Sequence, residues 1–164
     1  MQNVIVKKIN KNNRGVFADK DFKKGEIILY IKGKVISKSK LFALSGYFND
    51  HSGTIGKDKY LIFGYPEKYI NHSCSPNVFE YKRKVIAIRD IRRWEEVNFD
   101  YSICSIDDWK MRCRCGSKNC RKIVRGNFFK LSKRLQIKYI PYLDEWFKVE
   151  FKKELNQLNV ISKI

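Results

Sequence analysis

The feature that most restricts how this chain can fold is a cluster of three cysteines within eight residues, Cys113, Cys115 and Cys120. Thiolates at this spacing suit a tight loop around one metal ion, and structural zinc sites are almost always four-coordinate. A disulfide framework fits less well, because the five cysteines are an odd number and three of them are clustered. The fourth ligand must come from elsewhere in the chain, and the spacing leaves four candidates open: His51, His72, Cys74 and Cys104.

The composition is that of a folded domain with a large positive charge. A length of 164 residues, with 43% hydrophobic and 14% aromatic residues, is enough for one compact domain and a modest extension. The formal charge is +18, and residues 1–50 and 121–164 each carry 11 basic and 4 acidic residues, against 13 and 9 between them. These basic ends predict either contact with nucleic acid or nucleoprotein, or simply a surface solvated by lysine.

The sequence also carries signals about location. No apolar run approaches the ~18 residues that a membrane-spanning helix needs, and the N-terminus is too short in apolar residues for a secretory signal. Clustered cysteines that hold a metal favour a reducing compartment. We therefore expect no membrane contact and an intracellular protein, cytoplasmic or nuclear, or one delivered to a host cell if its source is bacterial. The sequence does not predict the oligomeric state.

The hydrophobic pattern changes its period after about residue 101. Up to that point the chain alternates between short apolar runs and turns, which predicts strands at Val4–Ile9, Glu26–Ile31, Lys59–Phe63, Asn77–Tyr81, Val85–Arg89 and Glu96–Tyr101, with a short helix at Leu41–Phe48. Beyond Cys120 the apolar residues recur every three or four positions, which predicts a helix that begins just after Pro141. Ser132 is placed to cap a shorter helix before it. The helical face consists of Leu143, Phe147, Phe151, Leu155 and Leu158.

Three motifs follow one another along the chain. They are Asn71-His72-Ser73-Cys74-Ser75-Pro76-Asn77, then Glu95-Glu96-Val97-Asn98-Phe99-Asp100-Tyr101, then the cysteine cluster. Each is weak alone, but in this order they resemble the SET-domain protein lysine methyltransferases with a zinc-binding post-SET segment. The resemblance implies a mainly β fold, the SET β-clip with a knot-like C-terminal crossing, a zinc-bound post-SET loop and C-terminal helices. The implied division is a SET domain at 1–106, a post-SET zinc-binding segment at 107–124 and a C-terminal helical extension at 125–164.

The resemblance further implies S-adenosylmethionine as the methyl donor. Asn71 and the backbone around His72 match the family motif that holds the methionine and adenine parts of this molecule. Asn13-Arg14-Gly15-Val16 resembles the first SET motif, where a glycine lets the backbone approach the donor closely. Tyr69 takes the place of the aromatic residue that precedes the Asn-His motif, and His51 is expected on the other side of the donor. The implied cofactor-binding residues are Arg14, Gly15, Val16, His51, Tyr69, Asn71, His72 and Tyr101.

Tyr101 is the expected catalytic residue. Methyl transfer from a sulfonium to an amine is a direct displacement, so the enzyme needs alignment more than a covalent intermediate. The substrate lysine, with a reference pKa of about 10.4, must arrive neutral, and a dry channel disfavours its ammonium form. Phe99 falls where relatives have Phe or Tyr, which implies di- or trimethylation. Tyr30 falls near a tyrosine that lines the lysine channel in relatives.

The resemblance also identifies a fourth zinc ligand. In the family, the cysteine of Asn-His-Ser-Cys completes the tetrahedron, which implies the ligand set Cys74, Cys113, Cys115 and Cys120 and leaves Cys104 as a buried free thiol. The chain departs from the family pattern at three positions. Asn13 and Trp94 stand where glycines are usual. Lys122 follows Cys120 and Arg121, at the glycine position of the expected Cys-Arg-Gly.

The predicted function is therefore S-adenosylmethionine-dependent methylation of an exposed lysine in a partner protein, either a histone or another DNA-associated or basic protein. The alternative is a catalytically silent SET-like module that binds nucleic acid through its basic ends. Tyr101 together with Asn71-His72 argues against the alternative, because a binding module does not need a methyl-transfer channel.

Overall fold

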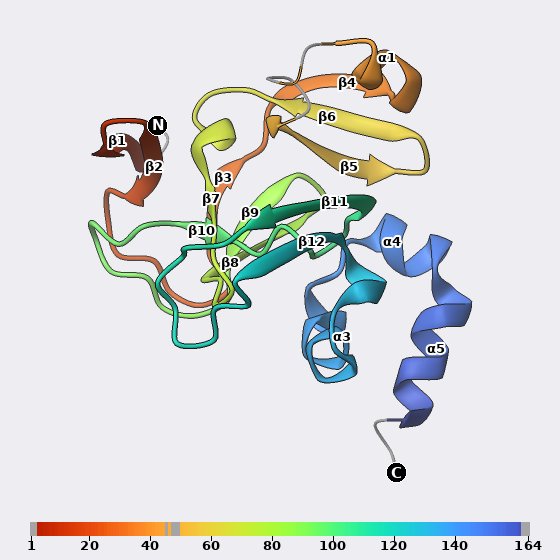
Figure 1. Cartoon of the computed structure of the whole chain (residues 1–164). Helices are drawn as coiled ribbons and strands as arrows, with labels where there is room; N and C mark the ends of the chain where they lie inside the picture. The colour runs from red at the N-terminus through yellow and green to blue at the C-terminus, as the bar shows by residue number, and fades with distance from the viewer. Residues whose placement is uncertain (1–2, 45, 47–49, 162–164) are drawn as a thin grey trace.

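The computed structural model describes residues 3–44, 46 and 50–161. Its helices are α1 (Lys38–Phe42), α3 (Lys133–Tyr139), α4 (Glu145–Glu150) and α5 (Lys152–Ile161), with single 3-10 turns η1 (Glu67–Tyr69), η2 (Phe128–Lys130) and η3 (Ile140–Tyr142). Its strands are β1 (Val4–Asn10), β2 (Asn13–Ala18), β3 (Ile27–Tyr30), β4 (Gly33–Ser37), β5 (Ser52–Gly56), β6 (Lys59–Phe63), β7 (Asn71–His72), β8 (Val78–Tyr81), β9 (Lys84–Ala87), β10 (Asn98–Phe99), β11 (Ile106–Arg112) and β12 (Ile123–Asn127). Figure 1 shows the strands forming the body of the molecule, with α3, α4 and α5 gathered beside it.

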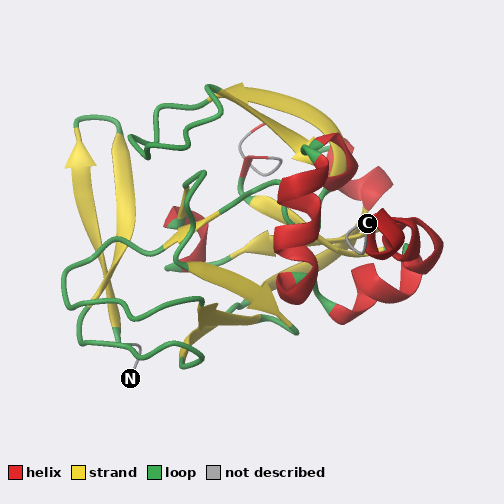
Figure 2. Ribbon diagram, turned by 90° about the horizontal axis from the view of Figure 1, so that it is seen from below, coloured by secondary structure: helices red, strands yellow, loops and turns green. Residues whose placement is uncertain are grey.

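The described strands form several small sheets instead of one large sheet. Two sheets have three strands, in the orders β4-β6-β5 and β3-β9-β8, and β1-β2 and β11-β12 are antiparallel pairs. The remaining pair, β7 with β10, is parallel. In Figure 2 the hairpin beside the N-terminus lies at the edge of the molecule opposite the helices.

The strand predictions are confirmed at β1, β3, β6, β8 and β9. The strand expected at Glu96–Tyr101 is reduced to the two residues of β10, because the segment before it bonds to β2 through the Val97 N–H and the Val16 carbonyl, at 2.8 Å. The structure contains strands that the pattern did not predict, namely the two-residue β7 and the longer β2, β4, β5, β11 and β12. Most of their residues are only half-buried or exposed, so their apolar alternation is weak.

The main core lies where the small sheets meet. Most of its buried members come from β2, β3, β6, β8 and β9 and from the segments that precede β7 and β10, and they include Val16, Leu29, Leu61, Ile70 and Val97. Tyr69 and Phe99 pack against this core from its edge. The core therefore supports, from behind, the two short strands that carry the Asn-His and Phe-Asp-Tyr motifs.

A second core lies among the C-terminal helices. Ser132 caps α3 as predicted, because its hydroxyl accepts the N–H of Leu135 at 3.4 Å. The single helix expected after Pro141 is wrong: α4 begins after Asp144, and the chain leaves helical geometry at Phe151 before α5. This break lets Phe147 and Phe151 pack on Phe129, with ring centroids 5.8 and 5.2 Å away, while α5 folds onto the same cluster.

The helix expected at Leu41–Phe48 is confirmed only at its start, where α1 (Lys38–Phe42) begins three residues earlier than predicted and ends at Phe42. Ser37 caps α1, and its hydroxyl accepts the N–H of Lys40. Positions 45, 47 and 48 of the prediction lie outside the described residues. Among the helices in the described part of the chain, none has the length and apolar character to cross a membrane.

Candidate functional site

The parallel pair β7–β10 brings the two central motifs together. Its register places Asn71 beside Asn98 and His72 beside Phe99, although these residues are nearly thirty positions apart in sequence. The Asn71 amide donates hydrogen bonds to the Arg14 carbonyl and to Glu96 Oε1, both at 2.8 Å. Asn71 therefore links β2 to the second motif. It is a positioning residue as well as a candidate for binding the cofactor.

His72 is buried and held in one tautomer. Its Nδ1 accepts the backbone N–H of Tyr101 at 3.2 Å, which places the ring proton on Nε2, 3.3 Å from the Sγ of Cys74. Burial is the main reason that the pKa of His72 falls to about 4, and the nearby Asp100 carboxylate opposes this shift only in part. His72 is therefore a neutral structural residue at physiological pH, and its Nε2–H points at a cysteine sulfur.

Tyr101 stands between two cavities. The smaller has a volume of about 410 Å³ and the larger about 830 Å³, and both are lined by Asp50, His51, Lys68 and Tyr101. The Tyr101 hydroxyl donates to the Ile70 carbonyl at 2.7 Å, which fixes its position, and burial raises the pKa of its phenol. A neutral hydroxyl held at the junction of two cavities can contact molecules bound in both.

The smaller cavity collects most of the residues that the sequence assigns to the cofactor. Arg14, Tyr69 and Asn71 line it together with His51 and Tyr101, and the guanidinium of Arg14 lies 5.6 Å from the centre of the Tyr69 ring. Gly15, Val16 and His72 are not among its lining residues. A volume of this size and polar character suits a small polar ligand.

Gly15 acts through the space that it leaves. A Cβ at this position would lie 2.5 Å from Glu96 Oε1 and 2.7 Å from the side chain of Ile9, so any other residue would push these groups apart. The Glu96 oxygen is the one that accepts from the Asn71 amide. Gly15 therefore permits the close approach of β2 to the second motif.

The larger cavity contains Phe99 but not Tyr30. Phe99 lines it beside Tyr101, together with Tyr60, Trp109 and other residues of β5, β6 and β11. Tyr30 is 57% exposed on β3, and among the described residues it lines neither cavity. Tyr30 therefore lies outside the two cavities that meet at Tyr101, whereas its neighbours Ile28 and Leu29 are buried in the core.

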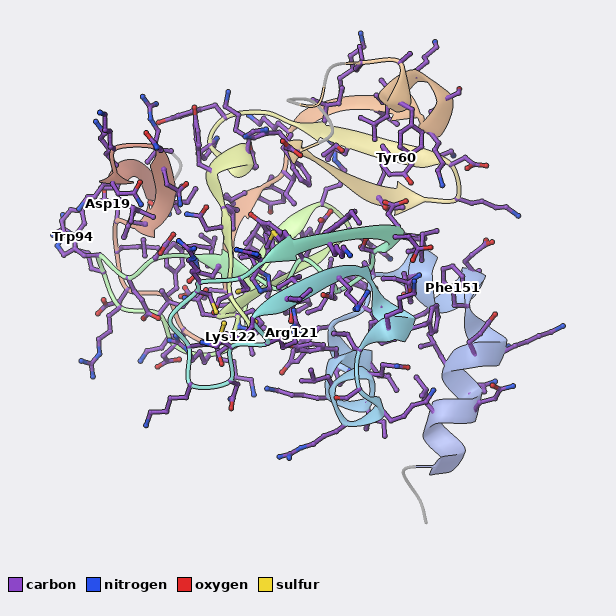
Figure 3. All side chains as sticks on the ribbon, in the orientation of Figure 1. Asp19, Tyr60, Trp94, Arg121, Lys122 and Phe151 are labelled. Atoms are coloured by element: carbon purple, nitrogen blue, oxygen red, sulfur yellow. The ribbon has the colours of Figure 1, made fainter. Side chains whose placement is uncertain are left out.

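The four cysteines of the predicted zinc site come together. The Sγ atoms of Cys74, Cys113, Cys115 and Cys120 all lie within 4.8 Å of one another, and Cys74 Sγ is 3.8 Å from Cys113 Sγ. Sulfurs that bind zinc tetrahedrally at about 2.3 Å stand about 3.8 Å apart. The donor set and its spacing fit a structural zinc ion. Figure 3 shows Arg121 and Lys122 beside the sulfur atoms.

In the metal-free protein, the local environment shifts the pKa values of the thiols in different directions. Burial raises the pKa of Cys74 and raises that of Cys113 to about 12. Burial acts on Cys115 in the same direction, but hydrogen bonds from the Cys74 N–H and from Ser117 outweigh it and lower its pKa to about 6. Cys115 is therefore better prepared than Cys74 or Cys113 to bind a metal as a thiolate.

Cys104 is separate from this cluster. Its Sγ accepts the backbone N–H of Asp144 at 3.1 Å, and burial raises its pKa to about 12. The thiol that the sequence predicts to be buried and free is thus protonated, supports the start of α4 and lies outside the cysteine cluster.

The sequence reasoning missed a buried ion pair at the centre of the site. The fully buried Asp100 carboxylate accepts two hydrogen bonds from the Arg121 guanidinium, both at 2.7 Å. The Arg121 backbone N–H in turn donates to Cys74 Sγ at 3.4 Å. Asp100 directly precedes Tyr101, so this pair joins the segment that carries Tyr101 to the cysteine loop. The Cys-Arg dipeptide at 120–121 was the only signal that could have indicated it.

The C-terminal helices reach the same carboxylate. The Tyr139 hydroxyl, on α3, donates to Asp100 Oδ2 at 3.0 Å. The Ser102 hydroxyl accepts from Arg121 and donates to the Arg125 carbonyl on β12. Asp100 therefore fastens three separate parts of the chain, since it contacts the second motif, the cysteine loop and α3.

The cysteine geometry makes a prediction about metal content. We expect elemental analysis to find a single zinc ion per chain, and Cys104→Ser to retain it, because Cys104 Sγ serves only the Asp144 N–H. Cys74→Ser should lose zinc or hold it far more weakly, because it removes one of four converging sulfurs. Loss of zinc from Cys104→Ser with retention by Cys74→Ser would show that the fourth ligand is wrongly assigned.

Comparison with known proteins agrees with this geometry. The family model described as the SET domain matches residues 13–102, more than half of the chain. The chain is 30% identical over 141 residues to the variant-silencing SET domain-containing protein of Plasmodium falciparum, an alignment that covers 73% of this chain and 6% of that protein. It is 31% identical over 131 residues to the histone-lysine N-methyltransferase trithorax of Drosophila virilis, with 69% and 3% covered.

A third relative, the human histone-lysine N-methyltransferase 2D, is 30% identical over 137 residues, with 73% of this chain and 2% of the relative covered. The chain thus spans 6% or less of the length of these curated relatives. The match and the small sheets of the structure confirm the predicted fold class. The chain belongs to the SET-domain family and is homologous to histone-lysine methyltransferases.

Proposed function

We propose that this chain transfers methyl groups from S-adenosylmethionine to a lysine side chain of a protein. The observation that carries the proposal is the position of Tyr101, with its hydroxyl fixed at the junction of two cavities of different character. The smaller, more polar cavity is the candidate donor site, and the larger cavity, which contains Phe99, is the candidate lysine site. Relatives that share the family are named as lysine methyltransferases.

The proposed division of work follows from the contacts of each residue. When bound, S-adenosylmethionine supplies an electrophilic methyl group. The chain aligns the two partners, which can account for much of the rate of a direct displacement. Tyr101 stays protonated because burial raises its pKa, so its hydroxyl can orient the incoming amine without taking a proton from it. Phe99 contributes an apolar wall that disfavours the ammonium form of the lysine.

The cysteine cluster is proposed to hold zinc in a structural role. Cys74, Cys113, Cys115 and Cys120 would bind the ion, which would link β7 to the loop between β11 and β12. We propose on this basis that residues 107–124 act as a post-SET segment and residues 125–164 as a helical extension that supports it. The Asp100–Arg121 pair would transmit the order of this loop to Tyr101.

The substrate is proposed to be a histone or another basic protein. The relatives' names point to histones, and a lysine-rich protein offers many candidate side chains. Radiolabelled methyl transfer into histones and into a whole-cell lysate, with the labelled proteins identified by mass spectrometry, tests this part. Absence of label in any protein, from zinc-loaded enzyme, would favour the catalytically silent module.

Phe99→Tyr is expected to change the number of methyl groups that are added to the lysine. The added hydroxyl would retain a water where the second methyl group must go, so we expect the first methylation to persist and later ones to fall by about tenfold or more, for one hydrogen-bonded water that must be displaced. Mass spectrometry of the methylated substrate measures the ratio of mono- to di- and trimethyl-lysine. An unchanged ratio would show that Phe99 does not limit the number of methyl groups.

A further inference from the structure

Trp94 lies in a turn at a position whose left-handed backbone conformation favours glycine. The turn is closed by a hydrogen bond of 3.0 Å from the Glu95 N–H to the Arg92 carbonyl, and Trp94, at its third position, has φ +70°. This position of a turn normally carries Gly or Asn, because a side chain there collides with the backbone. A bulky residue in this conformation is a genuine outlier, and such strain is a pointer to function.

The turn does not need the indole to keep its shape. The Trp94 N–H donates to the Ala18 carbonyl at 2.8 Å, and the Ala18 N–H donates to the Glu95 carbonyl at 2.9 Å. The side chain itself is 47% exposed. Figure 3 shows it projecting from the edge of the molecule, beyond the β1–β2 hairpin and near Asp19. Trp94 therefore has a strained backbone conformation, although its side chain does not pack in the core.

Two cations lie against the exposed ring. Lys7 Nζ, from β1, is 3.9 Å from the ring centre, and the Arg93 guanidinium carbon is 4.2 Å from it. Asp19 Oδ1 holds Arg93 Nη2 at 3.2 Å, and Asp21 accepts the Arg93 backbone N–H, so the guanidinium is fixed in place. Among the described residues, neither Lys7 nor Arg92 forms an ion pair with a carboxylate.

We propose that Lys7, Arg93 and Trp94 form a binding site for single-stranded nucleic acid. Unstacked bases bind to aromatic rings and guanidinium planes, and the neighbouring cations neutralise the phosphates. An acidic peptide would need the cations but would gain nothing from an indole at a strained turn. Duplex DNA buries its bases, so it also could not use the ring.

The charge of the whole chain fits this ligand. The net charge is +18, and residues 1–50, which include Lys7, carry 11 basic against 4 acidic residues. Trp94 lines neither of the two cavities among the described residues. The site is therefore separate from the proposed methyl-transfer site, and the inference does not depend on that function.

The test compares the full chain with Trp94→Gly in zinc-containing buffer. Fluorescence anisotropy with a labelled, mixed-sequence single-stranded oligonucleotide should show about 5- to 100-fold weaker binding by the variant, the range for loss of one stacked base. Thermal unfolding of the variant should occur at no lower temperature than in the wild type, because glycine suits the turn. Trp94→Asn, which also tolerates this backbone, provides a second variant.

Phe42→Ala is the matched control. Phe42 is also exposed and also has a lysine against its ring, with Lys38 Nζ 5.8 Å from its centre, but it lies on α1. We expect it to bind the oligonucleotide as the wild type does. Lys7→Gln should weaken binding and reduce the salt dependence by about 0.7 in the slope of log K against log salt, the value for one phosphate contact to a single strand.

Three outcomes would overturn the proposal. The first is absence of binding to the oligonucleotide by the wild-type chain at low salt. The second is equal affinity of the wild type and both Trp94 variants. The third is competition by polyglutamate or by duplex DNA as strong as by unlabelled single strands, which would assign the patch to polyanions in general. Preference for single strands that depends on Trp94 supports it.

Discussion

Tyr101→Phe is expected to retain the fold and the zinc ion while turnover falls by about 10²–10³-fold. The substitution removes one hydroxyl and leaves the ring, whose centroid lies 5.3 Å from that of the His72 ring. Loss of one positioned polar group in a dry site costs about 2.7–4 kcal/mol in the transition state. The hydroxyl also satisfies the Ile70 carbonyl, so a modest drop in stability should accompany the loss of activity. Initial rates at saturating methyl donor, alongside thermal unfolding, separate the two effects.

Tyr30→Phe is the matched control. It makes the same chemical change in a tyrosine that is 57% exposed and lines neither cavity among the described residues. We expect its turnover to remain close to that of the wild type. Near-normal turnover by Tyr101→Phe, or an equal loss in both variants, would remove Tyr101 from its catalytic role.

Arg121→Gln is expected to cause the largest loss of stability. It leaves the Asp100 carboxylate fully buried without its positive partner, and breaking one side of a buried pair costs about 3–5 kcal/mol. The same change weakens the link between the cysteine loop and Tyr101, so zinc should also dissociate faster. Urea unfolding of zinc-loaded protein and the rate of zinc capture by a chelator measure the two effects.

Lys130→Gln is the comparison for this prediction. Lys130 Nζ and Asp108 Oδ1 form an ion pair at 2.6 Å, as short as the buried one, but both side chains are about half exposed or more. Solvent screens such pairs, so this change should scarcely affect unfolding. The double variant Asp100→Asn/Arg121→Gln should be less destabilised than Arg121→Gln alone, because no unpaired charge remains. An effect of Arg121→Gln as small as that of Lys130→Gln would contradict the central place given to Asp100.

The sequence was sufficient for the parts of the site that are local. The Asn-His and Phe-Asp-Tyr motifs and the cysteine cluster were recognisable from their residues, and their order predicted the family. The fourth sulfur was different, because spacing left four candidates and only the resemblance selected Cys74. In the structure, Cys74 reaches the loop because β7 pairs with β10 and the Arg121 N–H donates to its sulfur.

The contacts of Asp100 lay beyond sequence reasoning. A buried aspartate, an arginine 21 positions later and a tyrosine 39 positions later have no common periodicity. The cysteine loop brings the arginine to the aspartate, and the packing of α3 brings the tyrosine. The break at Phe151 was hidden for a related reason. The apolar spacing continues through it, so the pattern fits one helix, whereas burial of the phenylalanines on Phe129 favours two.

Two of the three departures from the family pattern, Trp94 and Lys122, were visible in the sequence but are explained only by the backbone. Trp94 and Lys122 have φ values of +70° and +63°, which explains why glycine suits these positions. The structure shows that the chain adopts this left-handed conformation at both positions with larger side chains.

Methyl transfer to the lysine ε-amine is the decisive measurement for the proposed chemistry. Zinc-loaded protein is incubated with radiolabelled S-adenosylmethionine and histones, and in parallel with histones whose lysines have been chemically acetylated and with the Tyr101→Phe variant. We predict label in the unmodified histones, identified as methyl-lysine by mass spectrometry, and loss of label in both comparisons. Label that persists after acetylation, or that Tyr101→Phe transfers as fast as the wild type, would contradict the proposed chemistry.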